Sequence, residues 1–154
     1  MIKKISFITI IILSLFLITG CDKKVEGSLE EIMTKVYENI KEEERPMMLT
    51  NMEVNSDNIE YYLGTNEIEY EEALASESAV GSIAHSVVLL RAKPNSDIES
   101  IKTKIKESIN PRKWICVGVD EKDIIVENKG DLIILILVED SKTRQTLEKG
   151  FNNL

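Results

Sequence analysis

The chain has few of the side chains on which enzymes and metal sites usually depend. Its 154 residues include one histidine, one tryptophan and two cysteines, and aromatic residues make up only 5%. A zinc site usually takes about four cysteine or histidine ligands, and this chain has too few of these residues to form one. Gly-rich phosphate loops, paired-cysteine motifs, His-Glu-x-x-His and Gly-x-Ser-x-Gly are all missing. The sequence predicts no catalytic residue, no metal and no cofactor.

Ser82 and His85 are the nearest approach to a catalytic pair. Nucleophilic catalysis requires the base within hydrogen-bond reach of the nucleophile and a third group that orients the base. On a strand, residues three positions apart point to opposite faces. We therefore expect His85 to be a surface residue or a hydrogen-bonded core residue.

Long hydrophobic runs are also missing, except at the start of the chain. Lys3 and Lys4 precede the apolar run from Ile5 to Ile18, which is too short to cross a membrane, since a transmembrane helix needs about 20 residues. A charged start, a short apolar run and small residues before a cysteine are typical of a cleavable export signal. The alternative is a short uncleaved anchor.

Ile18, Thr19, Gly20 and Cys21 resemble the lipobox of bacterial lipoproteins. The resemblance implies that diacylglycerol is attached to Cys21 and that cleavage makes Cys21 the new N-terminus. Two acyl chains hold a protein to a bilayer stably, whereas one chain holds it only marginally. We therefore expect a signal peptide over 1–20, a lipidated tether over 21–27 and a single domain over 28–154. The protein would be exported and anchored to the outer face of the cytoplasmic membrane.

The chain has fewer basic than acidic residues. The chain has 19 basic and 27 acidic residues, and removal of residues 1–20, which carry two lysines and no acid, leaves a net charge of −10. This excess of acid disfavours nucleic acid as a partner, because phosphate backbones require a basic surface. It also repels an anionic lipid surface. The sequence predicts that the lipid on Cys21 alone holds the domain to the membrane.

Cys116 is the only other cysteine, so it has no intramolecular partner once Cys21 carries lipid. Its apolar neighbours favour a small buried core residue over a reactive or intermolecular thiol. The same reasoning assigns Met47, Met48 and Met52 to irregular gaps in the core rather than to a ligand surface.

Segments with helical periodicity alternate with short apolar runs. A capping box at Ser28–Glu31 predicts a helix that ends before Pro46, and a second box at Ser96–Glu99 predicts a helix up to Asn110. Asn128–Asp131 predicts the turn of a hairpin. We further expect the following elements: a short helix from Ser56 to Gly64, strands at 67–71, 83–92, 114–119, 124–126 and 132–138, and a last helix capped by Asp140 or Ser141 with Leu147 and Phe151 buried. The fold class is therefore α+β, an antiparallel sheet of about four strands covered by amphipathic helices on at least one face.

Three polar or aromatic groups have both a functional and a structural interpretation. Glu67, Glu69 and Glu71 would share one face of a strand, where they either bind calcium or form a solvated surface. Tyr61, Tyr62, Tyr70 and Trp114 either stack on a sugar or pack in the core. Lys102, Lys104, Lys106, Arg112 and Lys113 form a basic patch that we interpret as solvated surface.

Several stretches resemble the bacterial family called domain of unknown function 4358. The resemblance covers 29–138 and lies in four stretches, Val36–Tyr37, Tyr61–Gly64, Ala79–Lys93 and Lys129–Leu135, whereas Arg112–Asp120 departs from the family pattern. It implies an exported single-domain lipoprotein and brings no activity and no catalytic residues.

These observations favour a non-catalytic binding or accessory module at the cell envelope, with an envelope protein or ligand as partner. The alternatives are an envelope-acting hydrolase and a structural lipoprotein that dimerises through an edge strand.

Overall fold

The computed structural model describes residues 24–154. The predicted export signal, the predicted lipobox residues Ile18, Thr19 and Gly20, and the predicted lipid attachment residue Cys21 lie outside this range. Within it, none of the helices is both long enough and apolar enough to span a membrane.

Five antiparallel strands form one sheet in the order β1-β2-β3-β5-β4, where the sequence predicts an antiparallel sheet of about four. The strands are β1 (Leu49–Glu53), β2 (Tyr70–Ser78), β3 (His85–Ala92), β4 (Ile125–Lys129) and β5 (Leu132–Val138). Every residue of β3 and β5 is buried, as the apolar runs of both segments predict. The predicted hairpin is confirmed, with Gly130 at a φ of 56° in its turn.

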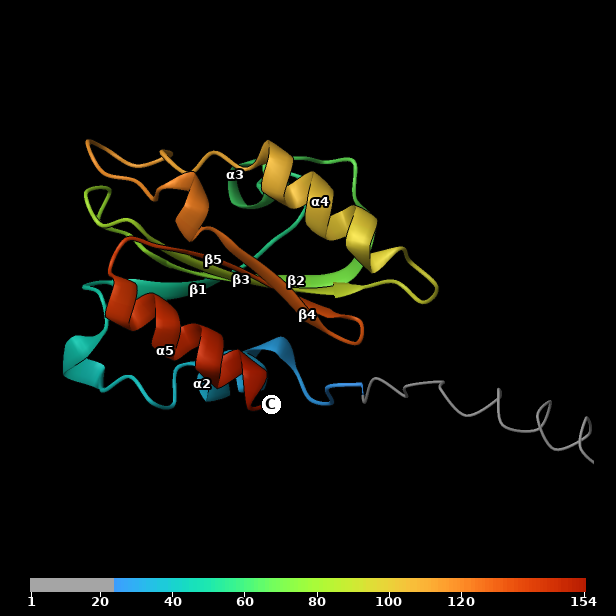
Figure 1. Cartoon of the computed structure of the whole chain (residues 1–154), viewed down its shortest axis with the longest axis horizontal. Helices are drawn as coiled ribbons and strands as arrows, with labels where there is room; N and C mark the ends of the chain where they lie inside the picture. Colours follow the sequence, from blue (N-terminus) through green and yellow to red (C-terminus); the bar gives the residue numbers. More distant parts are fainter. Residues whose placement is uncertain (1–23) are drawn as a thin grey trace, which may run out of the picture.

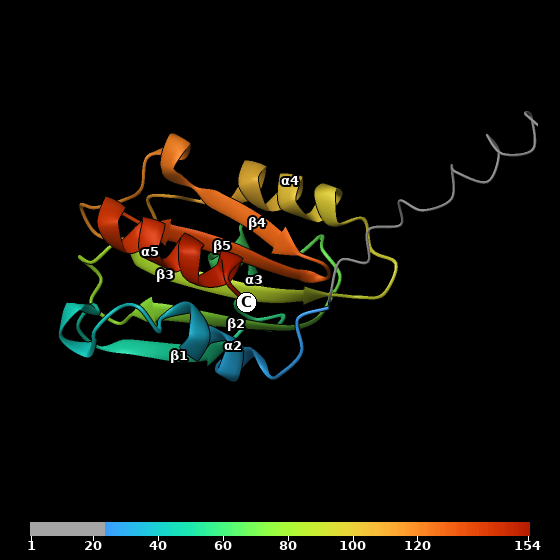
Figure 2. The same ribbon diagram turned by 60° about the horizontal axis from the view of Figure 1, so that its bottom comes forward.

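Four α-helices cover both faces of the sheet. As Figure 1 shows, α3 (Ile59–Leu63) and α4 (Ile98–Ser108) lie on one face, and α2 (Leu29–Val36) and α5 (Ser141–Asn152) lie on the other. Figure 2 shows the sheet between these two layers from a second direction. Alternate residues of each central strand serve the two cores: Val88 and Leu90 pack under α4, while Val87 and Leu89 pack under α2 and α5.

Capping residues close in the sequence determine where most helices begin or end. Ser28 and Glu31 form the predicted capping box of α2, and Gly64 ends α3 in the left-handed conformation. Asp140 caps α5, whose Leu147 and Phe151 are fully buried as predicted. At α4 the cap is Asp97, which accepts from the Ser100 amide, so the predicted capping box at Ser96–Glu99 is wrong.

Other elements also differ from the prediction. The first helix ends at Val36, and only a 3-10 turn at Glu42–Glu44 follows before Pro46. The segment 47–54, for which the sequence predicts no helix or strand, contains strand β1, because Leu49 to Glu53 pair with Ser78 to Leu74 of β2. Residues 114–119 form no strand. Of the predicted strand at 67–71, only Tyr70 and Glu71 belong to β2, which continues to Ser78.

Gly150 provides a test of how closely the two helices on one face approach each other. A Cβ atom at this position would lie 2.4 Å from the carbonyl oxygen of Val36 at the end of α2. Alanine favours a helix interior by about 1 kcal/mol over glycine. We nevertheless expect Gly150→Ala to lower the free energy of unfolding by about 2 kcal/mol, because the helices must move apart. Urea unfolding beside Lys149→Ala, an exposed neighbour, checks this, and a stabilised Gly150→Ala protein would contradict the packing.

Candidate protein-binding surface

The two ends of the sheet carry different chemistry. Arg91, near the end of β3, is buried and donates from Nη1 to the Val25 carbonyl at 2.9 Å and from Nη2 to the Gly27 carbonyl at 3.0 Å. Its Nε atom pairs with Glu72 at 2.8 Å. These bonds fix the start of the described chain to this end of the sheet, which we call the tether end. Ser86, five residues earlier on β3, is about 17 Å away along the strand, at the distal end.

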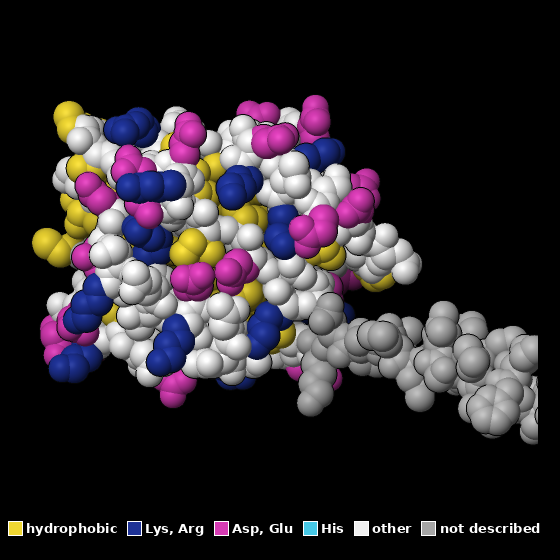
Figure 3. Space-filling view, viewed as in Figure 1, with side chains coloured by type: hydrophobic (Ala, Val, Ile, Leu, Met, Phe, Trp, Pro, Cys, Tyr) yellow, Lys and Arg dark blue, Asp and Glu magenta, His cyan; other side chains and the backbone are white. Residues whose placement is uncertain are grey.

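Large hydrophobic side chains are exposed at the distal end and, in the case of Met52, next to it on the edge strand β1. The exposed fractions are 71% for Met47, 65% for Met48, 50% for Met52, 46% for Tyr61 and 70% for Ile115. The prediction that the three methionines fill gaps in the core is therefore wrong. Figure 3 shows hydrophobic side chains gathered at the left edge of the molecule, away from the start of the described chain.

Main-chain contacts around the β2–β3 turn bring Met47, Met48 and Ile115 together. The Met47 carbonyl accepts from the Ser78 hydroxyl at 2.8 Å, and the Met48 carbonyl accepts from the Ala79 amide at 3.0 Å. The Ile115 amide donates to the Gly81 carbonyl at 2.7 Å. We call the exposed set Met47, Met48, Met52, Tyr61 and Ile115 the distal apolar surface.

A buried ion pair lies beneath this surface. Lys113 Nζ is 2.7 Å from Glu77 Oε2, and the side chains of the two residues are only 4% and 11% exposed. The Tyr61 hydroxyl donates to the other Glu77 oxygen, and Lys113 Nζ lies 4.1 Å from the centre of the Tyr61 ring. Lys113 is therefore not part of a solvated basic patch, contrary to the prediction.

Burial controls the electrostatics of this cluster. Burial removes water from the Lys113 ammonium group and lowers its pKa, although the Glu77 carboxylate opposes the shift. Burial, together with the hydrogen bond to Glu77, raises the pKa of Tyr61. Removing one partner of a buried ion pair usually lowers the stability of a protein by about 3–5 kcal/mol. Glu77 on β2 contacts both Tyr61 of α3 and Lys113, so it holds α3 and the 110–119 segment to the sheet.

Strained backbone and an unpaired donor also occur at this end. Met48 and Cys116 have φ angles of 52° and 62°, a conformation that costs a residue with a side chain about 1–3 kcal/mol. The indole Nε1 of Trp114 is buried and has no hydrogen-bond partner within residues 24–154. Cys116 is exposed, so its assignment to the core is wrong.

His85 is buried on the other face of the sheet and lies 2.7 Å from the Tyr37 hydroxyl through Nε2. This confirms the interpretation of His85 as a hydrogen-bonded core residue. Ser82 is exposed in the β2–β3 turn. Burial lowers the pKa of His85 to about 4, although Glu77 opposes the shift, and burial raises the pKa of Tyr37.

The glutamate side chains between residues 67 and 72 do not converge on one site. Glu69 pairs with Lys93 at 3.3 Å, and Glu72 pairs with Arg91. A cavity of about 450 Å³ has Glu30, Glu53, Glu71, Glu72 and Tyr70 among its lining residues. Among residues 24–154, however, no three potential ligands are placed to hold a metal ion. Of the four aromatic residues considered for sugar stacking, Tyr62 and Trp114 are buried, Tyr70 is half-buried and Tyr61 is exposed.

Comparisons with known proteins assign the chain to no family. No protein-family model matches the sequence, and neither the curated proteins nor the solved structures give a significant match.

The buried His85 leads to a prediction about pH. The pKa of about 4 in the folded protein lies below the value of about 6.5 expected in the unfolded chain, so the unfolded state takes up the proton first as the pH falls. The His85 contribution is complete above about pH 6.5 and is lost as the pH falls towards 4, by roughly 3 kcal/mol.

Urea unfolding between pH 4 and 7 measures this loss in the wild type and in His85→Gln. Carboxylates titrate in both proteins, so the difference between the two pH profiles isolates the histidine. Profiles that run parallel would show that His85 does not titrate as described.

Proposed function

We propose that the chain is a membrane-anchored extracytoplasmic lipoprotein whose domain binds another protein of the cell envelope through the distal apolar surface. The anchor is the diacylglyceryl group on Cys21. The observation that carries the proposal is the exposure of five large hydrophobic side chains at or next to the end of the sheet opposite the tether. Membership of the domain of unknown function 4358 family, which rests on the sequence resemblance alone, is part of the same proposal.

Three features of the distal end favour binding over a purely structural role. Met47, Met48 and Ile115 are each more than 60% exposed, and gathered apolar side chains on a surface mark interaction sites. Unbranched methionine side chains adapt to a partner's shape. The strained backbone at Met48 and Cys116 costs stability in the free domain, as is common where function overrides folding.

The expected partner is a protein with an apolar contact surface and a basic rim. The mature chain has a net charge of −10, which attracts a basic partner and repels an acidic one. β1 lies at the edge of the sheet beside the distal apolar surface, so an extended segment of the partner has room to pair with it. A second copy of this acidic chain would bring like charges together, which favours a different protein as partner.

An envelope-acting hydrolase is the competing function. It would need polar groups that converge on a cavity, with a nucleophile or base accessible to substrate. His85 is buried against Tyr37, and the Lys113 ammonium is engaged by Glu77 beneath Tyr61. These placements favour the binding function.

Photo-crosslinking in intact cells tests the proposal. A photoreactive residue in place of Met48 and another in place of Ile115 should capture the same protein, because both positions lie on the distal apolar surface. A photoreactive residue in place of Lys106, exposed on α4, should not capture it. Met48→Glu should reduce capture from position 115 about tenfold, since a charge left unpaired in an apolar contact costs at least about 1.4 kcal/mol.

Gln145→Glu is the matched control, because it adds one negative charge to an exposed position of α5. It should leave capture unchanged. A product with the mass of two copies of this chain would indicate the dimeric structural lipoprotein. Different products from positions 48 and 115, or capture that is insensitive to Met48→Glu, would contradict the proposed surface.

A further inference from the structure

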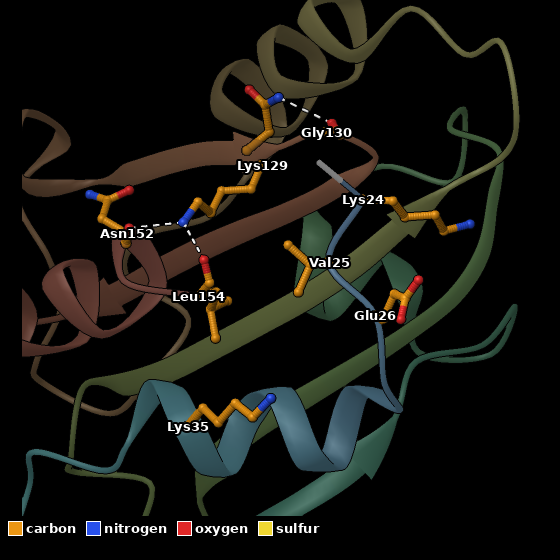
Figure 4. Close-up of a pocket in the computed structure, with 9 residues that line it drawn as sticks. Lys24, Val25, Glu26, Lys35, Lys129, Gly130, Asn152 and Leu154 are labelled. Carbon is orange, nitrogen blue, oxygen red and sulfur yellow. Dashed lines mark hydrogen bonds between the residues drawn. The ribbon is translucent and has the colours of Figure 1, made fainter. Parts of the chain in front are cut away.

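The tether end contains a cavity of about 690 Å³ with three lysines in its lining. Lys24, Val25 and Glu26 contribute from the start of the described chain, Lys35 from α2, and Lys129 and Leu154 from β4 and the chain end (Figure 4). Figure 4 shows the three lysines on different sides of this space, with the side chain of Lys35 lying along α2. Three cations therefore line one cavity of a strongly acidic protein.

Existing contacts hold two of the lysines in place. Lys129 Nζ donates to the main-chain oxygens of Asn152 and Leu154, both at 2.8 Å, which leaves one of its three donors. Lys24 Nζ lies 3.1 Å from Asp131, which is itself 3.6 Å from the Arg91 guanidinium. Lys35 is exposed in the last turn of α2. The cavity thus combines positioned ammonium groups with the apolar side chains of Val25 and Leu154.

The length of the tether brings this cavity to the membrane. Only two residues, Asp22 and Lys23, lie between Cys21 and Lys24, and the three steps from Cα to Cα span at most about 11 Å. Arg91 fixes Val25 and Gly27 to the sheet, so the tether cannot lengthen by peeling from the domain without breaking those bonds. If Cys21 carries diacylglycerol, the lysines lie within reach of the phosphates in the headgroup layer.

From this placement we propose that the cavity of Lys24, Lys35 and Lys129 binds the phosphate of an anionic phospholipid headgroup. The inference rests on the proposed lipid anchor at Cys21 and extends it. The three lysines outnumber Glu26, the one carboxylate side chain in the cavity lining. Salt screens charges farther away than about 10 Å, so the distant acids that make up most of the net charge of −10 act weakly here. The contact holds the domain in one orientation, with the distal apolar surface directed away from the bilayer.

The test uses the lipoprotein purified with its lipid and reconstituted into two kinds of vesicle. One kind contains phosphatidylcholine alone, and the other also contains phosphatidylglycerol. Cys116 is exposed at the distal end and carries a rigid fluorophore, and its anisotropy decay reports rotation of the domain. We expect slower rotation in the vesicles with phosphatidylglycerol, and loss of this difference at high salt.

Two charge reversals in matched positions identify the cavity. Lys35→Glu should abolish the effect of phosphatidylglycerol, whereas Lys106→Glu should preserve it. Lys35 and Lys106 are both exposed and both lie in the last turn of a helix, so the two changes have similar effects on helix stability. Loss of the effect in both variants would indicate general electrostatics and overturn the proposal.

The remaining outcomes separate the cavity from the anchor. Protein that fails to float with phosphatidylcholine vesicles would contradict the lipid anchor. Protein that floats but rotates equally in both kinds of vesicle would contradict the headgroup site alone. If inorganic phosphate perturbs the Lys35 resonances while phosphatidylglycerol leaves rotation unchanged, the cavity is a site for a free anion and the lipid proposal is overturned.

Discussion

The structure depends on the pairing of β3 with β5, two adjacent strands that are buried on both faces. Residues 85–91 of β3 pair with 138–132 of β5, and successive side chains alternate between the core under α4 and the core under α2 and α5. Both faces of this pair are therefore occupied by packing. Polar side chains on it are retained only where they are hydrogen-bonded, as His85, Ser86 and Arg91 are. Function is left to the ends and edges of the sheet.

Each end of β3 anchors a different part of the chain through a buried polar group. Arg91 holds the carbonyls of Val25 and Gly27 at the tether end, and the hydroxyl of Ser86 accepts from Lys113 at 3.3 Å at the distal end. The first contact decides where the tether meets the domain. The second fixes the segment that carries Ile115 and Cys116. One strand thus sets the separation between the proposed membrane contact and the proposed protein contact.

Elements with local signals could be predicted from the sequence. The capping box at Ser28, the glycine stop at Gly64 and the hairpin at Gly130 depend on residues close in the chain, and all three were correctly placed. Strand β1 could not be found in this way, because its pairing partner at Ser78 is far along the chain and four of its five residues are exposed. The predicted first helix is longer than α2, because Tyr37 and Ile40 continue the apolar pattern and are buried without being helical.

The candidate site was harder to predict than the fold. Lys113 has the sequence context of an exposed lysine, and its burial depends on Glu77, 36 residues away. Cys116 and Ile115 continue an apolar run that suits a buried strand, yet the positive φ at Cys116 turns the segment outward. The exposure of Met47 and Met48 likewise follows from their place beside an edge strand. Each of these features arises from contacts between distant segments, which periodicity does not report.

The central claim is that the two ends of the sheet face opposite ways, one towards the bilayer and one away from it. Paramagnetic broadening of backbone amides by headgroup-spin-labelled lipid, measured on the lipoprotein in nanodiscs, tests this most directly. We expect strong broadening of the amide resonance of Gly130, at the tether end, and little broadening of that of Gly81, at the distal end. Equal broadening at both glycines, or stronger broadening at Gly81, would contradict the claim.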